Sequence, residues 1–149
     1  MSADRAVPFE TTLLVRDTCL CLHAQRAARA LARRFDEALR PVGLSNGQFS
    51  LLMSLNRPEP AKLGGVAALL AMDRTTLTAA LKPLQRRGLL TVQPDPRDGR
   101  GRLLTLTEEG VQLLATAVPI WRDTHAAVDA ELGDVDPQAL RHALQVLAG

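Results

Sequence analysis

Hydrogen-bonding side chains that suit nucleic-acid recognition are concentrated between Arg74 and Arg102. The first half of this segment presents polar side chains at helical spacing, opposite a row of leucines: Arg74, Thr75, Thr76, Thr78 and Lys82. The second half carries three arginines around a turn: Arg97, Arg100 and Arg102. Arginine can bond guanine edges or phosphates, and threonine can bond bases and offer its methyl group to thymine. A guanidinium is also favoured in a narrow minor groove, where the negative potential is enhanced.

The charge distribution supports a polyanionic partner for this segment. The whole chain has a net charge of only +2. Residues 74–102 contain seven basic and two acidic side chains, whereas residues 103–149 contain two basic and seven acidic ones. An acidic segment repels DNA, so we expect the C-terminal part to lie away from it. Either basic surface alone would also fit an ordinary solvated helix or a charged hairpin, but the two together favour double-stranded DNA as the partner.

The elements that must position these side chains form a helix, a turn, a second helix and a hairpin. Leucines at helical spacing and Asp73, a favourable N-cap residue, indicate the two helices. Pro83 lacks an N–H group and is expected to kink the second helix in its second half. The expected bounds are a helix over 63–71, a helix from Asp73 to Arg87, and strands over 89–93 and 102–106 around a turn at 95–99. This order predicts a winged helix-turn-helix within a mainly α fold that has a small β-hairpin wing.

Apolar helices flank this unit on both sides. The sequence predicts a long helix over 11–40, then a helix that begins at Ser45 with a capping box to Gln48 and buries Phe49, Leu52 and Met53. Thr107 caps a further helix, whose heptad row is Val111, Leu114, Val118, Trp121, His125, Val128 and Leu132. The last helix begins at Asp136-Pro137, with Leu140, Leu144 and Leu147 expected to face inward.

These flanking helices have more apolar surface than one small winged-helix core can cover. We therefore expect one domain over 1–149, with a DNA-binding lobe at 45–107 and dimerisation helices at 9–41 and 108–149. The alternative is a monomer in which the flanking helices fold back on the core.

Composition and motifs favour a globular protein and argue against a membrane protein, a metalloprotein or an enzyme. Apolar residues make up 46% of the 149 residues, which is typical of a globular chain. The longest apolar run, 66–72, is too short to span a bilayer, and no secretory signal is evident, so a cytoplasmic location is expected. Three scattered histidines and two cysteines give no metal-ligand spacing, and no cofactor is expected. No nucleophile elbow, phosphate-binding loop or convergent acid–base pair supports an enzyme.

The chain resembles MarR-type (multiple antibiotic resistance regulator) transcription factors nearly from end to end. The matching positions are Leu44-Ser45 with Gln48-Phe49, then 72–78, Leu84 with Gly88-Leu89, Asp98-x-Arg100, and Leu104 with Leu106-Thr107-x-x-Gly110. The resemblance implies a homodimer joined through its terminal helices and a recognition helix in the major groove. It also implies that Arg100 enters the minor groove and that Asp98 orients it. Pro83, inside the recognition helix, departs from the family pattern.

The resemblance also suggests how such a protein would respond to a signal. The preferred hypothesis is a homodimeric repressor of a near-palindromic operator. A small lipophilic or aromatic ligand, bound between the lobe and the dimer helices, would release the repressor from DNA. In the peroxide-sensing branch of the family, the reactive cysteine stands at the position of Cys21. That branch uses tyrosines to hold the thiolate, and this chain has none; Phe35 stands at one such position. The alternatives are a redox-sensing repressor acting through Cys21, a Cys21 that is only a small core residue, and a winged-helix dimerisation module that binds no DNA.

Overall fold

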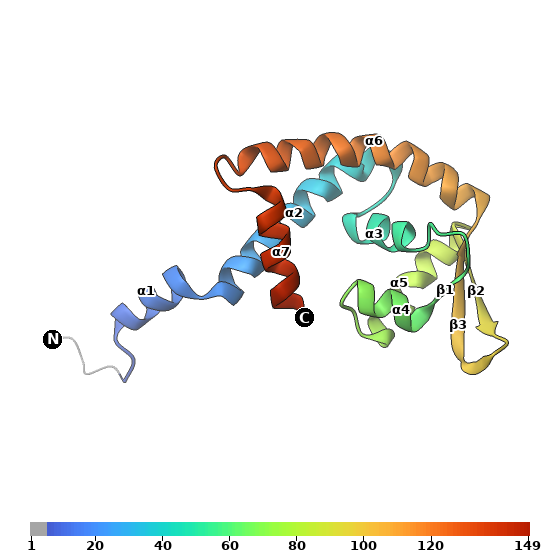
Figure 1. Cartoon of the computed structure of the whole chain (residues 1–149), viewed down its shortest axis with the longest axis horizontal. Coiled ribbons are helices and arrows are strands. Elements are labelled where there is room, and N and C mark those ends of the chain that lie inside the picture. The colour runs from blue at the N-terminus through green and yellow to red at the C-terminus, as the bar shows by residue number, and fades with distance from the viewer. Residues whose placement is uncertain (1–5) are drawn as a thin grey trace. The chain divides into compact units, whose positions relative to one another are not determined.

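A computed structural model describes residues 6–149 (Figure 1), and the chain in it forms two compact units. The first unit ends at Arg34 and the second runs from Phe35 to Gly149. Helix α2 begins in the first unit and ends in the second.

The first unit contains two helices where the sequence predicted one. Helix α1 spans Phe9–Thr18 and α2 spans Leu20–Leu39, so the prediction of an unbroken helix over 11–40 is wrong. Cys19 has an extended backbone, with φ −71° and ψ 108°. Its Sγ atom accepts a hydrogen bond from the N–H of Leu22 at 3.4 Å, which is the position of an N-cap acceptor. The break therefore has a local cause, because Cys19 ends one helix and caps the next.

The second unit begins with the end of α2, a short 3₁₀ helix η1 (Arg40–Val42) and helix α3 (Asn46–Ser54). The Ser45–Gln48 capping box is present in both directions, as the sequence predicted. Phe49 and Leu52 are buried as expected, but Leu51 is buried with them and Met53 is exposed. The predicted buried stripe is therefore wrong at Met53, because the buried face of α3 extends from Phe49 and Leu52 toward Leu51 and leaves Met53 outside it.

The helix-turn-helix consists of α4 (Leu63–Leu69) and α5 (Arg74–Arg86). Helix α4 ends two residues before the predicted bound, and Ala71 in the turn has a φ of 52°. Asp73 caps α5 by accepting the N–H of Thr76 at 2.7 Å. Helix α5 continues through Pro83 to Arg86.

Three strands form the wing and its base, in the order β1–β3–β2. Strands β2 (Leu90–Asp95) and β3 (Asp98–Leu106) make the hairpin, and β1 (Ala61–Lys62) pairs with the far side of β3. The sequence did not predict β1, since two residues carry no alternation pattern. Pro94 is tolerated because β2 is an edge strand, where a missing N–H breaks no ladder.

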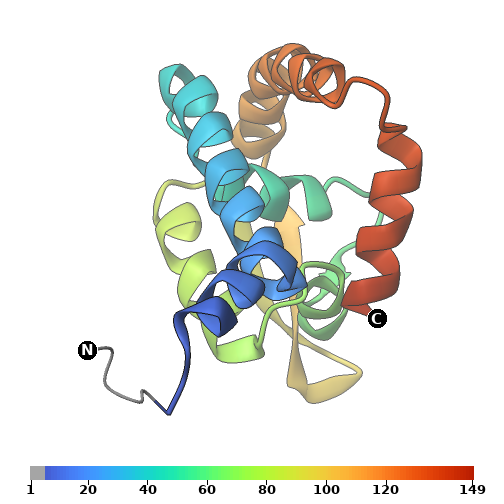
Figure 2. The same ribbon diagram turned by 90° about the vertical axis from the view of Figure 1, so that its left-hand side faces the viewer.

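Helix α6 (Glu108–Glu131) and helix α7 (Pro137–Ala148) complete the chain (Figures 1 and 2). Thr107 caps α6 by accepting the N–H of Gly110. Of the predicted heptad row, only Leu114 is fully buried, and Val111 is exposed. The leucines that were expected to face inward on α7 are exposed in the single chain, with Leu144 at 49% and Leu147 at 65%. That prediction is wrong for one chain, because no element of the second unit covers this side of α7.

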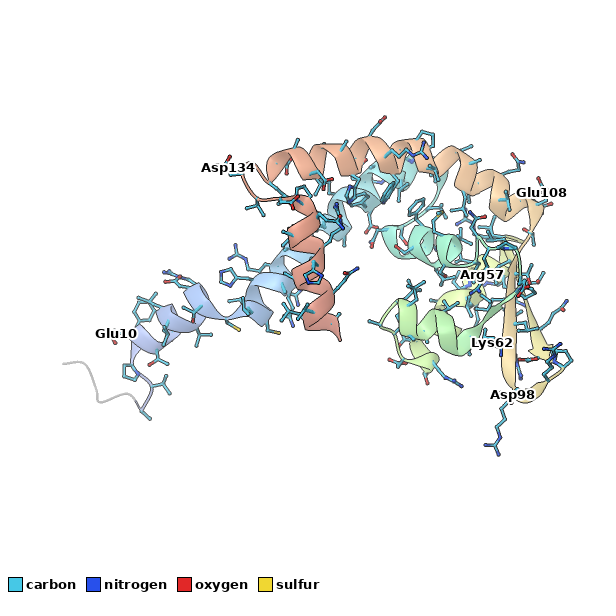
Figure 3. All side chains as sticks on the ribbon, in the orientation of Figure 1. Glu10, Arg57, Lys62, Asp98, Glu108 and Asp134 are labelled. Carbon is cyan, nitrogen blue, oxygen red and sulfur yellow. The ribbon has the colours of Figure 1, made fainter. Side chains whose placement is uncertain are left out.

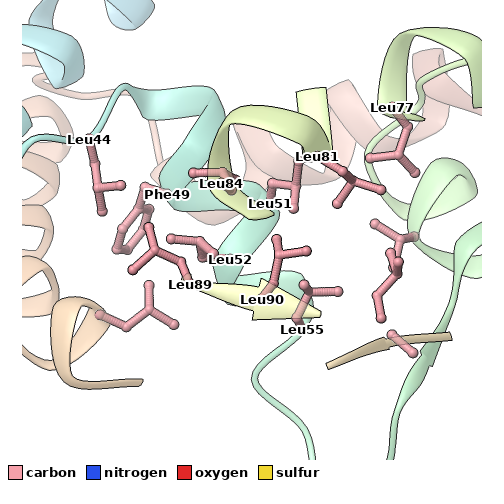
Figure 4. Close-up of a cluster of buried hydrophobic side chains, with 14 of the residues drawn as sticks. Leu44, Phe49, Leu51, Leu52, Leu55, Leu77, Leu81, Leu84, Leu89 and Leu90 are labelled. Carbon is pink, nitrogen blue, oxygen red and sulfur yellow. The ribbon is translucent and has the colours of Figure 1, made fainter. Parts of the chain in front are cut away.

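The hydrophobic core gathers side chains from α3, α4, α5, the sheet and the first half of α6 (Figure 4). Six leucines are fully enclosed in it: Leu39, Leu52, Leu77, Leu84, Leu90 and Leu104. The architecture is mainly helical with a small antiparallel wing, which confirms the predicted fold class.

Candidate nucleic-acid interface

Helix α5 buries one face and leaves the predicted polar face open. Leu77, Leu81 and Leu84 point into the core. The five predicted contact residues are all exposed: Arg74, Thr75, Thr76, Thr78 and Lys82. The leucine row therefore fixes the rotation of α5 about its own axis, and this rotation turns the polar side chains outward.

The start of α5 is held by a charged cap. The carboxylate of Asp73 accepts the backbone N–H of Thr76 at 2.7 Å and its hydroxyl at 2.8 Å. These hydrogen bonds, the backbone one first, lower the pKa of Asp73 below its usual value. The hydroxyl of Thr76 thus donates within the protein, so Thr76 can offer a DNA partner only its hydroxyl lone pairs and its methyl group.

The wing tip is built by two aspartates. Asp95 and Asp98 pair across the hairpin and leave Pro96 and Arg97 as the loop. Asp95 is buried and accepts the N–H of Arg97 at 2.9 Å, and Asp98 accepts the N–H of Arg100 at 3.1 Å. Figure 3 shows Asp98 at the tip and Glu108 at the other end of β3, where α6 begins.

Asp98 acts on Arg100 through the backbone. The resemblance implied that Asp98 orients Arg100, and the contact between the two residues runs from the Arg100 N–H to Asp98 Oδ1. The side chains of Arg97 and Arg100 are exposed. Asp95, which sequence reasoning did not select, also accepts a backbone N–H at the tip, as Asp98 does. Its signal was an Asp two residues before Arg97, the spacing of an Asx turn.

Not all of the basic charge in residues 74–102 is free to face DNA. The guanidinium of Arg87, at the end of α5, donates to the carbonyl oxygen of Gly43 at 2.9 Å. The guanidinium of Arg102 donates to the carbonyl oxygen of Gly101. Arg87 thereby ties the end of the recognition helix to the residue that follows η1, so its role in this structure is to position α5.

A mostly apolar cavity of about 490 Å³ lies between α3, α4 and α6. The rings of Phe49 and Trp121 stack in its wall, with centroids 6.2 Å apart and planes 18° apart. Its polar groups come from Ser50, Ser54 and Arg122. The remaining lining residues are apolar: Met53, Leu69 and Val118. Leu69 belongs to α4, the helix that precedes α5, so the cavity borders the helix-turn-helix.

Sequence comparison connects this geometry with known proteins. Residues 44–101 match the family model described as MarR family. The transcriptional activatory protein BadR of Rhodopseudomonas palustris is 32% identical over 126 residues, which cover 82% of this chain and 70% of that protein. The chain belongs to the MarR family.

A solved structure supports the same assignment. The M. tuberculosis transcriptional regulator MosR in complex with DNA superposes with a TM-score of 0.80 at 37% identity, covering 88% of this chain and 94% of that chain. The organic hydroperoxide resistance transcriptional regulator of Bacillus subtilis is 28% identical over 139 residues, or 93% of this chain and 92% of that protein. Membership of the MarR family confirms the predictions of a winged helix-turn-helix, of a transcriptional regulator and of a protein that is not an enzyme.

The two cysteines of this MarR-family chain have different settings. Both are free thiols, and Cys19 caps α2 as described above. Cys21 is exposed, and its Sγ accepts a hydrogen bond from Gln25 Nε2 at 3.4 Å. The reading of Cys21 as a small core residue is therefore wrong within a single chain.

Residues 6–149 show neither a membrane-spanning helix nor a metal-binding cluster. Every helix there is too short or too polar to cross a lipid bilayer. The same residues bring together no group of three histidine, cysteine, aspartate or glutamate side chains that could hold a metal ion.

Proposed function

We propose that this protein is a homodimeric, sequence-specific DNA-binding repressor that a small lipophilic or aromatic ligand releases from a near-palindromic operator. One observation carries the proposal: the exposed polar face of α5 and the arginine-bearing wing tip belong to one lobe with a continuous core. A lobe of this kind can present both surfaces to a duplex without rearranging.

In this proposal α5 enters the major groove and the wing follows the backbone into the adjacent minor groove. Thr75, Thr76 and Thr78 face base edges and thymine methyl groups, and Lys82 meets the backbone. Arg97 and Arg100 extend from the tip that Asp98 holds, and Arg100 takes the minor-groove position. We propose a cytoplasmic location for such a regulator, because its proposed partner is chromosomal DNA.

The homodimer is proposed to form through the helices at 9–41 and 108–149, leaving the lobe at 45–107 for DNA. Support comes from apolar side chains that stay exposed in one chain, on α1, α2 and α7: Phe9, Leu14, Val15, Leu20, Leu140, Leu144 and Leu147. A second copy that covers them would remove this surface from water. Twofold symmetry would then place two recognition helices about 10–10.5 base pairs apart and account for a near-palindromic operator.

Selection of bound sequences from random duplexes tests the DNA-binding proposal. We expect enrichment of an inverted repeat with that half-site spacing, and binding that weakens steeply as salt increases. Binding with no sequence preference would contradict an operator-specific regulator. Failure to bind any duplex at low salt would favour the winged-helix dimerisation module.

The cavity between α3, α4 and α6 is the proposed effector site. The aromatic wall formed by Phe49 and Trp121 suits a flat apolar ligand, and Arg122 with the Ser50 hydroxyl could bind a carboxylate on it. The Ser54 hydroxyl already donates to the carbonyl oxygen of Leu51. Trp121 is the single tryptophan of the chain, so its fluorescence reports occupancy directly.

We expect 1-naphthoate to change Trp121 fluorescence and to release the protein from its operator over the same concentration range. Ser50→Phe, which fills the cavity, should abolish both responses. Thr116→Phe, on α6 outside this cavity, is the matched control and should abolish neither. Release of the Ser50→Phe variant by the same ligand would remove this cavity as the effector site.

Redox sensing through Cys21 is the second candidate, favoured by the exposure of its thiol and by the similarity to the organic hydroperoxide regulator. A thiolate would attack the peroxide O–O bond, forming a sulfenate and releasing an alcohol. The test treats the operator complex with cumene hydroperoxide and compares the parent with Cys21→Ser. Release of the parent alone, reversed by a thiol reductant, would establish this mode in place of ligand release.

A further inference from the structure

Gly64, in the first turn of α4, leaves a space that the guanidinium of Arg74 occupies. A Cβ atom added to Gly64 would lie 2.7 Å from Arg74 Nη2 and 3.6 Å from Cζ. The next residue, Gly65, has no atom within 4 Å of the same position. Only one of the two successive glycines is therefore in contact with this arginine.

The contact links the two helices of the helix-turn-helix. Arg74 is the first residue of α5, yet its guanidinium reaches back to the start of α4. Within residues 6–149, this guanidinium makes no hydrogen bond or ion pair. Its N–H donors stay available to a partner, and in this structure they lie beside Gly64.

Glycine is unfavourable inside a helix relative to alanine, because it loses more backbone freedom on folding. At Gly64, in the first turn of α4, an added Cβ atom would displace the guanidinium, whereas the space beside Gly65 is open.

We propose that Gly64 is a positioning residue for DNA binding and that it holds Arg74 as a phosphate contact instead of a base reader. This inference rests on the proposed DNA-binding function. In a helix-turn-helix, the first helix crosses the DNA backbone and the exposed face of the second reads base edges. A guanidinium against the start of α4 lies on the backbone side, where phosphate contacts fix the register of the protein on DNA.

A substitution at Gly64 should change DNA binding without changing the fold. The atom that a new Cβ would meet is the tip of a long, flexible side chain, so Gly64→Ala leaves the fold intact and moves the guanidinium. Loss of a phosphate contact weakens operator and unrelated DNA alike. It also reduces the slope of log K against log salt by about 0.9 per contact.

The experiment measures binding by fluorescence anisotropy, using the selected operator and a shuffled duplex of equal length, from about 50 to 200 mM salt. The variants are Gly64→Ala, Gly65→Ala, Arg74→Ala and the double variant Gly64→Ala/Arg74→Ala. Gly65→Ala is the matched control, because it makes the same change one residue along in the same helix. Thermal unfolding checks that both glycine variants remain folded.

We expect Arg74→Ala to weaken binding to both duplexes about equally and to reduce the salt slope by about 0.9 for each protomer. Gly64→Ala should weaken binding several-fold in the same way, Gly65→Ala should not, and Gly64→Ala should have no further effect once Arg74 is removed.

Equal binding by the Gly64→Ala and Gly65→Ala variants would overturn the inference. So would an Arg74→Ala variant that loses preference at one base pair with an unchanged salt slope. Absence of binding by the unmodified protein would overturn the proposed function itself, a result distinct from either of these.

Discussion

The lobe that carries the candidate DNA interface and the helices at the two ends of the chain differ in how they satisfy their apolar faces. In the lobe, the leucine row of α5 finds partners within the same chain, and Leu84 is fully enclosed. In α1 and α7 no residue is buried, although both helices carry several large apolar side chains. The lobe is thus complete as one copy, and the terminal helices are not.

The same pattern, a row of apolar side chains on a helix, thus has two different outcomes in this protein. An apolar row shows that a helix face will avoid water, but it does not say whether the cover comes from the same chain or from another. The following predictions test that division, from the largest expected effect to the smallest.

Removing a core leucine should destabilise the lobe whatever the protein concentration. Leu84→Ala leaves a cavity among α3, α5 and the sheet, so we expect the free energy of unfolding to fall by about 2–5 kcal/mol. Urea unfolding at two protein concentrations measures it. A loss below about 1 kcal/mol would show that this core is less tightly packed than its burial indicates.

A charge on the exposed side of α7 should prevent formation of the proposed dimer. Leu144→Asp is expected to convert the proposed dimer to a monomer in sedimentation, since burying each leucine contributes about 1.5–3 kcal/mol and twofold symmetry counts it twice. Gln145→Asp places the same charge one residue along and should leave the dimer intact. A Leu144→Asp variant that remains dimeric would show that α7 lies outside the interface.

Substitutions on the surface of the lobe should weaken DNA binding and leave the stability of the fold unchanged. Arg100→Ala is expected to weaken operator binding by roughly 1–3 kcal/mol while the unfolding temperature stays unchanged, because its side chain is exposed and its backbone N–H keeps the bond to Asp98. Arg57→Ala, which removes an exposed arginine in the loop before β1, is the control with the same change of charge (Figure 3). Equal binding by both variants would mean that the wing does not contact DNA.

The smallest effect concerns the charge of Asp73. Its pKa is lowered in the folded state by the Thr76 hydrogen bonds, so its charged form adds stability above about pH 4 that is lost as the pH falls through the folded pKa. Asp73→Asn keeps a capping oxygen and removes the charge, so we expect a slightly lower unfolding temperature at pH 7. That difference should shrink as the solution is acidified below pH 4.

Asp123→Asn, which removes an exposed carboxylate on α6, is the control for this measurement. A difference between Asp73→Asn and the parent that does not depend on pH would show that the charge of the cap is unimportant.

The features that could be predicted from the sequence are those that depend on neighbours along the chain. The capping box at Ser45, the N-caps at Asp73 and Thr107 and the leucine row of α5 could all be predicted, because each involves residues within one or two helical turns. The polar face of α5 followed from the leucine row for the same reason.

The features that join distant segments depend on the folded structure and could not be predicted from local patterns. Strand β1 exists because β3 offers it a partner. Arg87 donates to the carbonyl oxygen of Gly43, 44 positions earlier in the chain, because the fold brings the two residues together. Arg74 turns toward α4 because Gly64 has no side chain, a contact between two helices that neither helix pattern encodes. The leucines of α7 follow a helical pattern and still remain exposed, since their pattern requires a cover and only the assembled fold decides which surface supplies it.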